Sequence, residues 1–530
     1  MNSKLYLVLI IFSLIGMTLV FIGTCKYGTG LCPDSVRYIS TARNLLSGNG
    51  YVKYDGSLFM RWPPLFPTVL AILGLLGIEP LDGARFVNIA AFGLIIFAFG
   101  QLLWNYLRSK TFVVLGSLSV TLSIPLLYVS SKAWAEPLLV LFIILFMITL
   151  QRFLNEKGPV PFVLLIIFAA LSCLQKYIGV AVVLTGFIII LILKKELSLL
   201  KKGLYALIFS VASLIPLIAW FIRNYILTMA NALGGYQPAN TFREQLLYML
   251  SIFTGKRYPA THTFFEHTQY AFYTVISWII PCLESFMLKA KDFILIMLFI
   301  AIVLFFLSFK SRSARKEVPV KRLLPLIIFS FIFTSILIIS ATLTDVSRPG
   351  HRLLSPLFPF FIIIIFVMIR SILMFLRETF KNKNLVNSIF LGIYMLWLIC
   401  STVVIFRSIL VYIWTGAGGK NSTAWQESAL IRWLRWNPPE GQVYTNKPEA
   451  IYILTGIPAK PPPTRGGLDF EQFKNSATLN QDNYIIWFYK TRRDWFNIKR
   501  GLSTIVNFRK KIAFPDGEIY IITPKNKQSI

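Results

Sequence analysis

The sequence is poor in charged residues, in acids and in histidine. Only 14% of its 530 residues are charged and 56% are hydrophobic, whereas an ordinary soluble domain is about 25% charged. Asp and Glu total 23 against 53 Lys and Arg, so the formal net charge is +30. Three histidines exclude a His-rich metal site, and the five cysteines have no metal-binding spacing. These shortages exclude a soluble globular protein and indicate a polytopic membrane protein.

Long apolar runs fill most of the first 413 residues. A helix needs about 20 apolar residues to cross a bilayer. The run at 5–23 follows a single Lys and has no small-residue cleavage site, so it predicts an uncleaved signal anchor. The run at 62–77 is too short to span, and we interpret it as a juxtamembrane or re-entrant element. We expect about eleven transmembrane helices, at 5–23, 85–107, 112–130, 136–152, 160–175, 177–193, 204–222, 290–309, 323–342, 353–370 and 386–412.

The basic residues gather in alternate loops between these spans. By the positive-inside rule, such loops face the cytoplasm. The N-terminus is then cytoplasmic, and an odd number of spans places the C-terminus outside the cell membrane. The charge excess is thus explained by membrane topology, and no nucleic-acid partner is expected. The basic loops are at 108–110, 152–157, 194–202, 310–322 and 370–383.

The chain divides into a transmembrane domain, 1–413, and a C-terminal domain, 414–530. The first contains two long outer loops, at 24–84 and 223–289. In the second, alternating runs at 484–489 and 518–523 predict strands, and Pro515-Asp516-Gly517 predicts a hairpin turn. Helical spacing appears at 428–436 and 448–454. We therefore expect a small extracytoplasmic α/β domain, with no Gly-rich phosphate loop and no internal repeat.

Several ionisable residues converge on the outer face in this topology. Ionisable groups near membrane depth are costly, and they commonly line a functional cavity. Two acids with several cations suit a site that activates a hydroxyl and holds a phosphate. The residues are Asp34 after the first span, Glu136 at the start of the fourth, Lys176 between the fifth and sixth, Arg223 at the end of the seventh, and Arg348, His351 and Arg352 before the tenth.

Each of these residues also has a simpler interpretation when taken alone. A Lys or Arg at a span end is commonly an anchor that reaches the interface. Glu136 before Pro137 can be a charge facing the helix dipole, and Asp34 can be a turn or cap residue. Cys25 and Cys32 flank one short outer segment and can pair in an oxidising compartment or remain thiols. It is the gathering of the ionisable groups at one face that favours a functional site.

The order of the motifs resembles the membrane glycosyltransferases of the GT-C fold, in the branch of ArnT-like, protein-mannosyltransferase-like and RgtA/B/C/D-like enzymes. The resemblance covers roughly 1–410. Ser35 stands where many members carry a second acid, and Lys176 where an Arg is common. The motifs are Asp34-Ser35-x-x-Tyr38, Ala42-Arg43-Asn44-Leu45-Leu46-x-Gly48-x-Gly50-Tyr51, Trp62-Pro63-Pro64-Leu65-Phe66-Pro67, Ala84-Arg85-Phe86-Val87-Asn88, Glu136-Pro137-Leu138, Trp220-Phe221-Ile222-Arg223-Asn224-Tyr225 and Arg352-Leu353-Leu354-Ser355-Pro356-Leu357-x-Pro359.

The resemblance implies an all-α polytopic fold and an inverting glycosyltransferase. Its donor would be a polyprenyl-phosphate-linked sugar, and its acceptor a lipid, a glycan or a protein at the outer face. Asp34 matches the family's first-loop catalytic acid, and Glu136 matches a second acidic position. Arg352, with Arg223, Lys176 and His351, would bind the donor phosphate, and Tyr38, Arg43 and Arg85 would support the site.

Two questions stay open at the level of sequence. The first is whether the protein is instead a transporter or lipid-carrier flippase without glycosyl-transfer chemistry. The long outer loops, the absence of repeats and the lack of acids deep in the spans favour the enzyme. The second is the metal: the acids form no metal cage, yet one or two carboxylates with a donor phosphate can hold a divalent ion. No other cofactor is implied.

Overall fold

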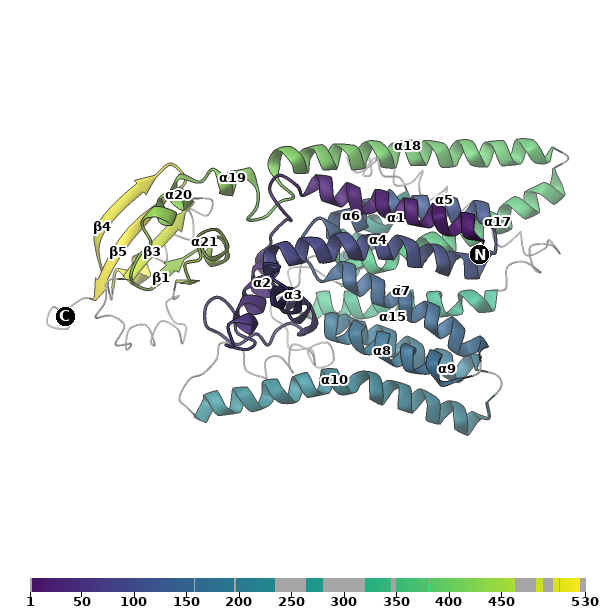
Figure 1. Ribbon diagram of the computed structural model, residues 1–530, viewed down its shortest axis with the longest axis horizontal. Coiled ribbons are helices and arrows are strands. Elements are labelled where there is room, and N and C mark those ends of the chain that lie inside the picture. The colour runs from purple at the N-terminus through teal and green to yellow at the C-terminus, as the bar shows by residue number, and fades with distance from the viewer. Residues whose placement is uncertain are drawn as a thin grey trace. The chain divides into compact units, whose positions relative to one another are not determined.

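The computed structural model describes most of the chain (Figure 1). The predicted span at 290–309 and Arg348 lie outside the described residues. The described residues are 2–156, 158–194, 197–233, 264–279, 320–344, 349–380, 382–462, 483–489, 499–504 and 506–524.

The chain forms two compact units. Residues of the predicted first outer loop fold in both of them, and most of that loop folds with the C-terminal residues. Unit one is Met1–Gly23, Met60–Val69 and Ala84–Val411, and unit two is Thr24–Phe59, Leu70–Gly83 and Tyr412–Ile530.

Apolar helices make up the described part of unit one. Seven described helices are long and apolar enough to cross a membrane, and α5 with α6, bent by 47°, forms an eighth if the pair is one span. The helices are α1 (Ser3–Gly23), α4 (Pro80–Leu107, which begins in unit two), α5 (Lys110–Thr121), α6 (Ile124–Ser130), α7 (Glu136–Asn155), α8 (Pro159–Gln175), η1 (Tyr177–Gly179), α9 (Val180–Leu193), α10 (Leu199–Leu233), α12 (Phe264–Ile279), α15 (Val320–Thr344), α16 (His351–Leu354), η3 (Ser355–Leu357), α17 (Phe358–Thr379) and α18 (Lys383–Thr415, which ends in unit two).

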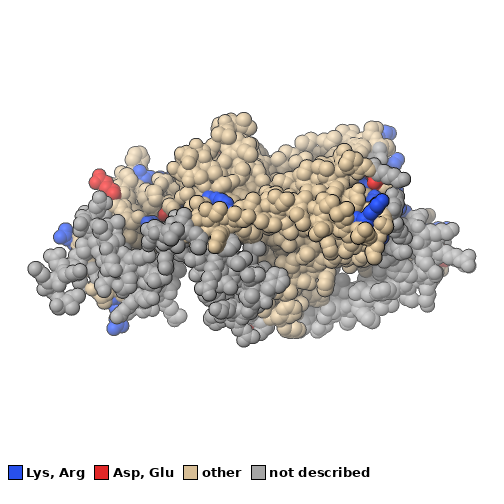
Figure 2. Space-filling model, turned by 90° about the horizontal axis from the view of Figure 1, so that it is seen from below, with Lys and Arg blue, Asp and Glu red and all other residues tan. Residues whose placement is uncertain are grey.

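These helices confirm the prediction of a polytopic membrane fold. Each predicted span that falls on described residues is helical, and the shorter ones at 160–175 and 177–193 are α8 and η1 with α9. Helix α18 is apolar around its circumference: Ile393 and Leu396 are 65% and 64% exposed. Exposed aliphatic side chains of this kind face lipid. The face seen in Figure 2 carries few charged side chains over the helices. The chain is an integral membrane protein.

Two described helices overlap the predicted second outer loop, 223–289. Helix α10 does not end at 222 but continues to Leu233, and α12 occupies 264–279. Pro216 lies inside α10 without ending it. Arg223 therefore lies within a helix and not at its end. Polar residues beyond the apolar stretch made the helix look shorter than it is.

Unit two contains a mixed five-stranded sheet. Strand order is β2-β1-β3-β5-β4, with β1 parallel to β2 and β3, and β5 antiparallel to β3 and β4. The predicted strands, helices and hairpin turn of the C-terminal domain are confirmed. The elements are α2 (Pro33–Leu46), α3 (Leu65–Leu75, divided between the units), α19 (Thr423–Gln426), α20 (Ala429–Trp436), β1 (Val443–Thr445), α21 (Pro448–Thr455), β2 (Ala459–Lys460), β3 (Asn483–Phe488), β4 (Val506–Phe514) and β5 (Gly517–Pro524).

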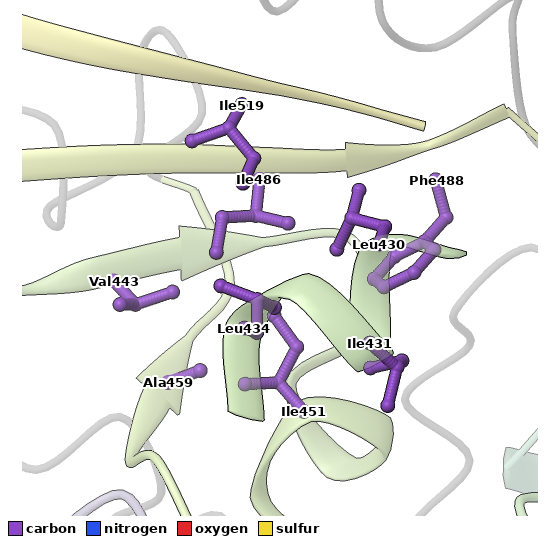
Figure 3. Close-up of a cluster of buried hydrophobic side chains, with 9 residues drawn as sticks. All are labelled: Leu430, Ile431, Leu434, Val443, Ile451, Ala459, Ile486, Phe488 and Ile519. Atoms are coloured by element: carbon purple, nitrogen blue, oxygen red, sulfur yellow. The ribbon is translucent and has the colours of Figure 1, made fainter. Parts of the chain in front are cut away.

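The sheet is buried on both faces. Successive side chains of a strand point to opposite faces, and β3 follows this rule. Ile486 and Phe488 pack with α20 and α21, whereas Ile485 and Trp487 belong to a separate core on the other face. Figure 3 shows Ile451 of α21 within the first of these cores. Helix α21 is thereby fixed to the sheet, and its remaining face is available for other contacts.

Candidate functional site

A buried carboxylate holds two cations in unit one. Glu136 is the first residue of α7, and its side chain is 1% exposed. Its Oε1 atom accepts a hydrogen bond from Lys176 Nζ at 2.5 Å and another from Arg352 Nε at 2.6 Å. We call these three residues the Glu136 cluster. The structure thus brings together three predicted site residues that come from separate parts of the sequence.

The turn after α8 positions Lys176. Gln175 Nε2 donates to the Ala135 carbonyl at 2.9 Å, which ties the end of α8 to the start of α7. Gly179 closes the turn, since a Cβ atom there would lie 2.2 Å from the Ser172 carbonyl oxygen. Only glycine allows the backbone to approach so closely. Lys176 is therefore presented by a tightly packed turn.

An aromatic ring and a buried amide position Arg352. The Arg352 guanidinium carbon lies 4.2 Å from the centroid of the Trp134 ring, a cation–π contact. Asn88 on α4 is fully buried, and its Nδ2 donates to the carbonyls of Lys132 at 2.6 Å and Trp134 at 3.1 Å. Asn88 thus holds the segment that carries the ring. The sequence reasoning gave Asn88 no role.

The second carboxylate oxygen of Glu136 is a spare acceptor. Glu136 Oε2 is buried and has no hydrogen-bond partner among the described residues, and the same is true of Gln175 Oε1. Buried polar atoms are nearly always paired with protein or water, so an unpaired one requires a reason. A water molecule or a substrate hydroxyl donates to atoms of this kind.

The Glu136 cluster carries a net positive charge. Lys176 and Arg352 contribute two positive charges and Glu136 one negative charge. The cation side chains are 18% and 25% exposed, whereas Glu136 is buried beneath them. A guanidinium and an ammonium held this way can bind a phosphate and stabilise charge that develops on it.

The structure places the other two predicted phosphate-binding residues, His351 and Arg223, on different partners. Trp278 Nε1 donates to His351 Nδ1 at 3.0 Å, so α12 is held against the residue before Arg352. Arg223 Nη1 donates to Asn224 at 2.9 Å, and its guanidinium lies 4.7 Å from the Trp220 ring centroid. Helix α10 also contacts the turn that carries Lys176. The ring of Phe221 stacks on the ring of Tyr177, the residue after Lys176, with ring centroids 5.5 Å apart.

An apolar cavity of about 560 Å³ lies among α12, α17 and α18. Trp278 lines it, together with aliphatic and aromatic side chains such as Phe361, Ile365, Ile369 and Trp397. Trp278 is also the residue that donates to His351. The cavity therefore adjoins the segment that carries Arg352, and its size is in the range of about 300–1,000 Å³ that small-molecule sites have.

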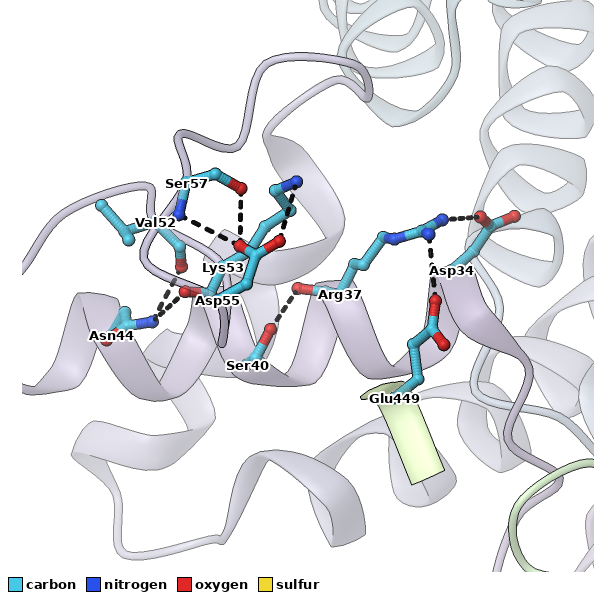
Figure 4. Close-up of polar contacts among 9 residues, drawn as sticks. All are labelled: Asp34, Arg37, Ser40, Asn44, Val52, Lys53, Asp55, Ser57 and Glu449. Carbon is cyan, nitrogen blue, oxygen red and sulfur yellow. Dashed lines mark hydrogen bonds and ion pairs between the residues drawn. The ribbon is translucent and has the colours of Figure 1, made fainter. Parts of the chain in front are cut away.

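In unit two, Asp34 lies in the first turn of α2 (Figure 4). Pro33 is the first helical residue, and an acid in the first turn complements the helix dipole. Cys32 N donates to Ser35 Oγ at 3.2 Å, so Ser35 caps the helix. Arg37 Nη1 contacts Asp34 Oδ1 at 3.4 Å. The sequence reasoning missed this helix within the outer loop.

The three predicted supporting residues have separate surroundings. Tyr38 is 1% exposed and packs edge-on against Phe59 in unit two. Arg43 Nη2 lies 2.7 Å from Glu79 Oε1, and its guanidinium lies 5.7 Å from the Tyr452 ring. In unit one, Arg85 donates to the carbonyl of Phe21. Their role in supporting the site stays a prediction.

The described carboxylates are poorly arranged for a metal ion. Within the ranges that the structure describes, no three His, Cys, Asp or Glu side chains gather. Asp34 is paired with an arginine, and Glu136 is paired with two cations. These positive charges would repel a divalent ion. Cys25 and Cys32, whose pairing the sequence left open, do not form a disulfide with each other.

Comparison with known proteins extends this picture. Models of known protein families and curated protein sequences gave no match. Among solved structures, ArnT from Cupriavidus metallidurans bound to undecaprenyl phosphate is 12% identical, with a TM-score of 0.61 over 96% of this chain and 97% of that chain. The chain has the GT-C fold.

Two more GT-C structures resemble the chain. The Archaeoglobus fulgidus oligosaccharyltransferase in its apo form is 12% identical, with a TM-score of 0.52 over 94% of this chain and 71% of that one. The arabinofuranosyltransferase AftD from Mycobacteria is also 12% identical, with a TM-score of 0.53 over 98% of this chain and 40% of its own. At this identity the comparisons establish the shared GT-C fold.

Proposed function

We propose that the protein is an inverting glycosyltransferase that moves a sugar from a polyprenyl-phosphate donor to an acceptor at the outer face of the membrane. The Glu136 cluster carries this proposal, because its two cations are held on one buried carboxylate. The ArnT structure with the same fold contains undecaprenyl phosphate, which supports a lipid-linked donor. The acceptor can be a lipid, a glycan or a protein.

Arg352 and Lys176 bind the departing phosphate in this mechanism. Arg352 directs its Nε to Glu136, and its two terminal nitrogens are the fork that grips phosphate oxygens. Lys176 adds a point charge. As the bond from C1 of the sugar to the phosphate breaks, negative charge grows on the phosphate, and fixed cations lower the energy of that transition state. His351 and Arg223 support the phosphate site from the adjacent segments.

Asp34 is the general base for the acceptor. Its carboxylate takes the proton of the acceptor hydroxyl while the hydroxyl oxygen attacks C1 from the side opposite the phosphate, so the anomeric configuration inverts. The Asp34 side chain is 25% exposed, which suits a group that has to meet an acceptor. Glu136 acts differently, as the counter-ion that orients the two cations.

The apolar cavity among α12, α17 and α18 is the proposed place for part of the donor's isoprenoid chain. Trp278 connects this cavity to His351, the residue before Arg352. An apolar chain that leaves the phosphate can enter a cavity with such a lining without losing polar contacts. The N-terminus would be cytoplasmic and the C-terminus extracytoplasmic, as the basic loops indicate.

The test is transfer by purified protein in proteoliposomes. The donors would be undecaprenyl-phosphate pentoses and hexoses labelled in the sugar, with a membrane lipid extract from the expressing cells as acceptor. Release of undecaprenyl phosphate with label appearing on the acceptor supports the enzyme. A flippase would move the donor across the bilayer and leave the sugar–phosphate bond intact, and this result would refute the proposal.

Asp34→Asn assigns the base. Removing a general base lowers the rate by about 10²–10⁴-fold, whereas the amide keeps the size of the side chain. Glu440→Gln is the matched control, because Glu440 is an exposed acid in the same unit. Loss of a general base would leave at most about a hundredth of the wild-type rate. If Asp34→Asn retains more than about a third of that rate, Asp34 is not the base.

A further inference from the structure

Arg37 is shared between two carboxylates in unit two. Its Nη2 donates to Glu449 Oε1 at 3.0 Å, and its Nη1 lies 3.4 Å from Asp34 Oδ1 (Figure 4). Charged hydrogen bonds of this type are usually about 2.7–2.9 Å long, so the guanidinium is held closer to Glu449 than to Asp34. Glu449 comes from the C-terminal domain, 412 residues after Arg37.

Glu449 is fixed by its helix. It lies in the first turn of α21 after Pro448, and its side chain is 12% exposed. Ile451 on the other side of α21 is buried in the sheet core. A glutamate on so short and well-packed a helix has little freedom to follow a moving arginine.

A second contact fixes α21 against the first outer loop. Tyr452, three residues after Glu449 and on the same helix face, stacks on Tyr54 with ring centroids 5.1 Å apart. The Arg43 guanidinium on α2 lies 5.7 Å from the same Tyr452 ring. Helix α21 therefore contacts α2 at two points, one at Arg37 and one at Arg43.

We propose that Glu449 is a positioning residue for Asp34: by holding Arg37 at 3.0 Å it keeps the contact of Arg37 with the proton-accepting carboxylate long, at 3.4 Å. This inference rests on the proposed function, in which Asp34 is the general base. An arginine one turn along the helix can close on Asp34 as a bidentate pair. The pair would occupy the oxygens that an acceptor hydroxyl needs. Glu449 competes for the guanidinium and prevents that closure, so the C-terminal domain takes part in readying the base.

The proposal predicts an unusual order of activities. Glu449→Gln removes the carboxylate that competes for Arg37, so Arg37 closes on Asp34. We expect kcat to fall by about tenfold, which is less than the loss of about 10²–10⁴-fold that removing a general base causes. The KM for the lipid donor stays unchanged, because the phosphate site is not touched. Arg37→Ala removes the blocking group itself and should reduce kcat less than Glu449→Gln does.

The decisive variant is the double substitution Arg37→Ala with Glu449→Gln. It should be more active than Glu449→Gln alone, since no arginine remains to close on Asp34. Glu449→Asp should lie between wild type and Glu449→Gln. The assay is the transfer of labelled sugar from undecaprenyl phosphate described above, with thermal unfolding followed for each variant and Glu440→Gln as the control.

Three results would overturn the proposal. The first is wild-type kcat in Glu449→Gln. The second is a double variant no more active than Glu449→Gln, which would mean that the contact only stabilises the fold. The third is equal loss in both single variants. Asp34→Asn in the same series separates the role of Glu449 from that of Asp34. If Asp34→Asn is inactive and the double variant does not recover activity over Glu449→Gln, only the role of Glu449 is wrong. If Asp34→Asn is active, the general base is another residue.

Discussion

Glu136→Gln distinguishes a counter-ion from a general base. The amide has nearly the shape of the carboxylate but no charge, so Lys176 and Arg352 would face each other without the anion between them. Both nitrogens now lie within 2.6 Å of the same oxygen. If Glu136 is a counter-ion, the substitution should therefore mainly lower the stability of the protein. If Glu136 is a general base, it should mainly lower the reaction rate.

The magnitude follows from the geometry. Two unit charges about 5 Å apart repel by about 3 kcal/mol at an effective dielectric constant of about 20. Removing one partner of a buried ion pair costs about 3–5 kcal/mol in measured cases. Since the two cations are 18% and 25% exposed and can turn partly toward water, we expect a loss of about 3 kcal/mol.

The assay is thermal unfolding in detergent, with and without undecaprenyl phosphate. The uncompensated cations should bind the phosphate more tightly, and a ligand at about 100 times its Kd stabilises a protein by about 2.7 kcal/mol. Undecaprenyl phosphate should thus raise the melting temperature of Glu136→Gln more than that of wild type. Glu156→Gln, at the exposed far end of α7, is the control. Unchanged stability with a rate loss of about 10²–10⁴-fold would refute the counter-ion role and make Glu136 a base.

Three further predictions concern the phosphate site and the topology. Arg352→Lys should raise the KM for the donor more than that for the acceptor, because an ammonium lacks the fork, and Arg352→Ala should raise it further; a wild-type donor KM in Arg352→Lys would move the phosphate site elsewhere. Gly179→Ala should lower both the melting temperature and donor use, since its Cβ would meet the Ser172 carbonyl at 2.2 Å, whereas Gly203→Ala, with open space around it, should do neither. In a Cys25→Ser background, Ser198→Cys should resist an impermeant thiol reagent in intact cells while Glu440→Cys reacts, and labelling of Ser198→Cys would invert the topology.

Sequence reasoning succeeded where one physical signal dominates. Apolar length predicts a membrane helix because the bilayer sets the length that is required, and the predicted spans on described residues are helices. The alternation at 484–489 and the Pro515-Asp516-Gly517 turn likewise predicted β3 and the β4–β5 hairpin. It failed where a helix outlasts its apolar stretch, as α10 does beyond 222.

The site was predicted less completely, because a topology prediction gives the depth of a residue in the membrane but not the side of its helix on which it lies. Glu136, Lys176 and Arg352 were expected at one face and do meet. His351 and Arg223 were expected at the same depth, and the contacts seen for them are with Trp278 and with Trp220 rather than with Glu136. No single-sequence pattern indicates a pair like Arg37 and Glu449, because 412 residues separate them.

The two acids differ in a way that supports the roles proposed for them. If Glu136 accepted a proton, it would lose the charge that holds Lys176 and Arg352 at the moment when the departing phosphate needs them in place. A proton on Asp34 has no such consequence, because Glu449 remains as the partner of Arg37. A base has to change charge in each turnover, and a counter-ion must not. The arrangement therefore supports the proposal in which Asp34 accepts the proton and Glu136 holds the two cations in place.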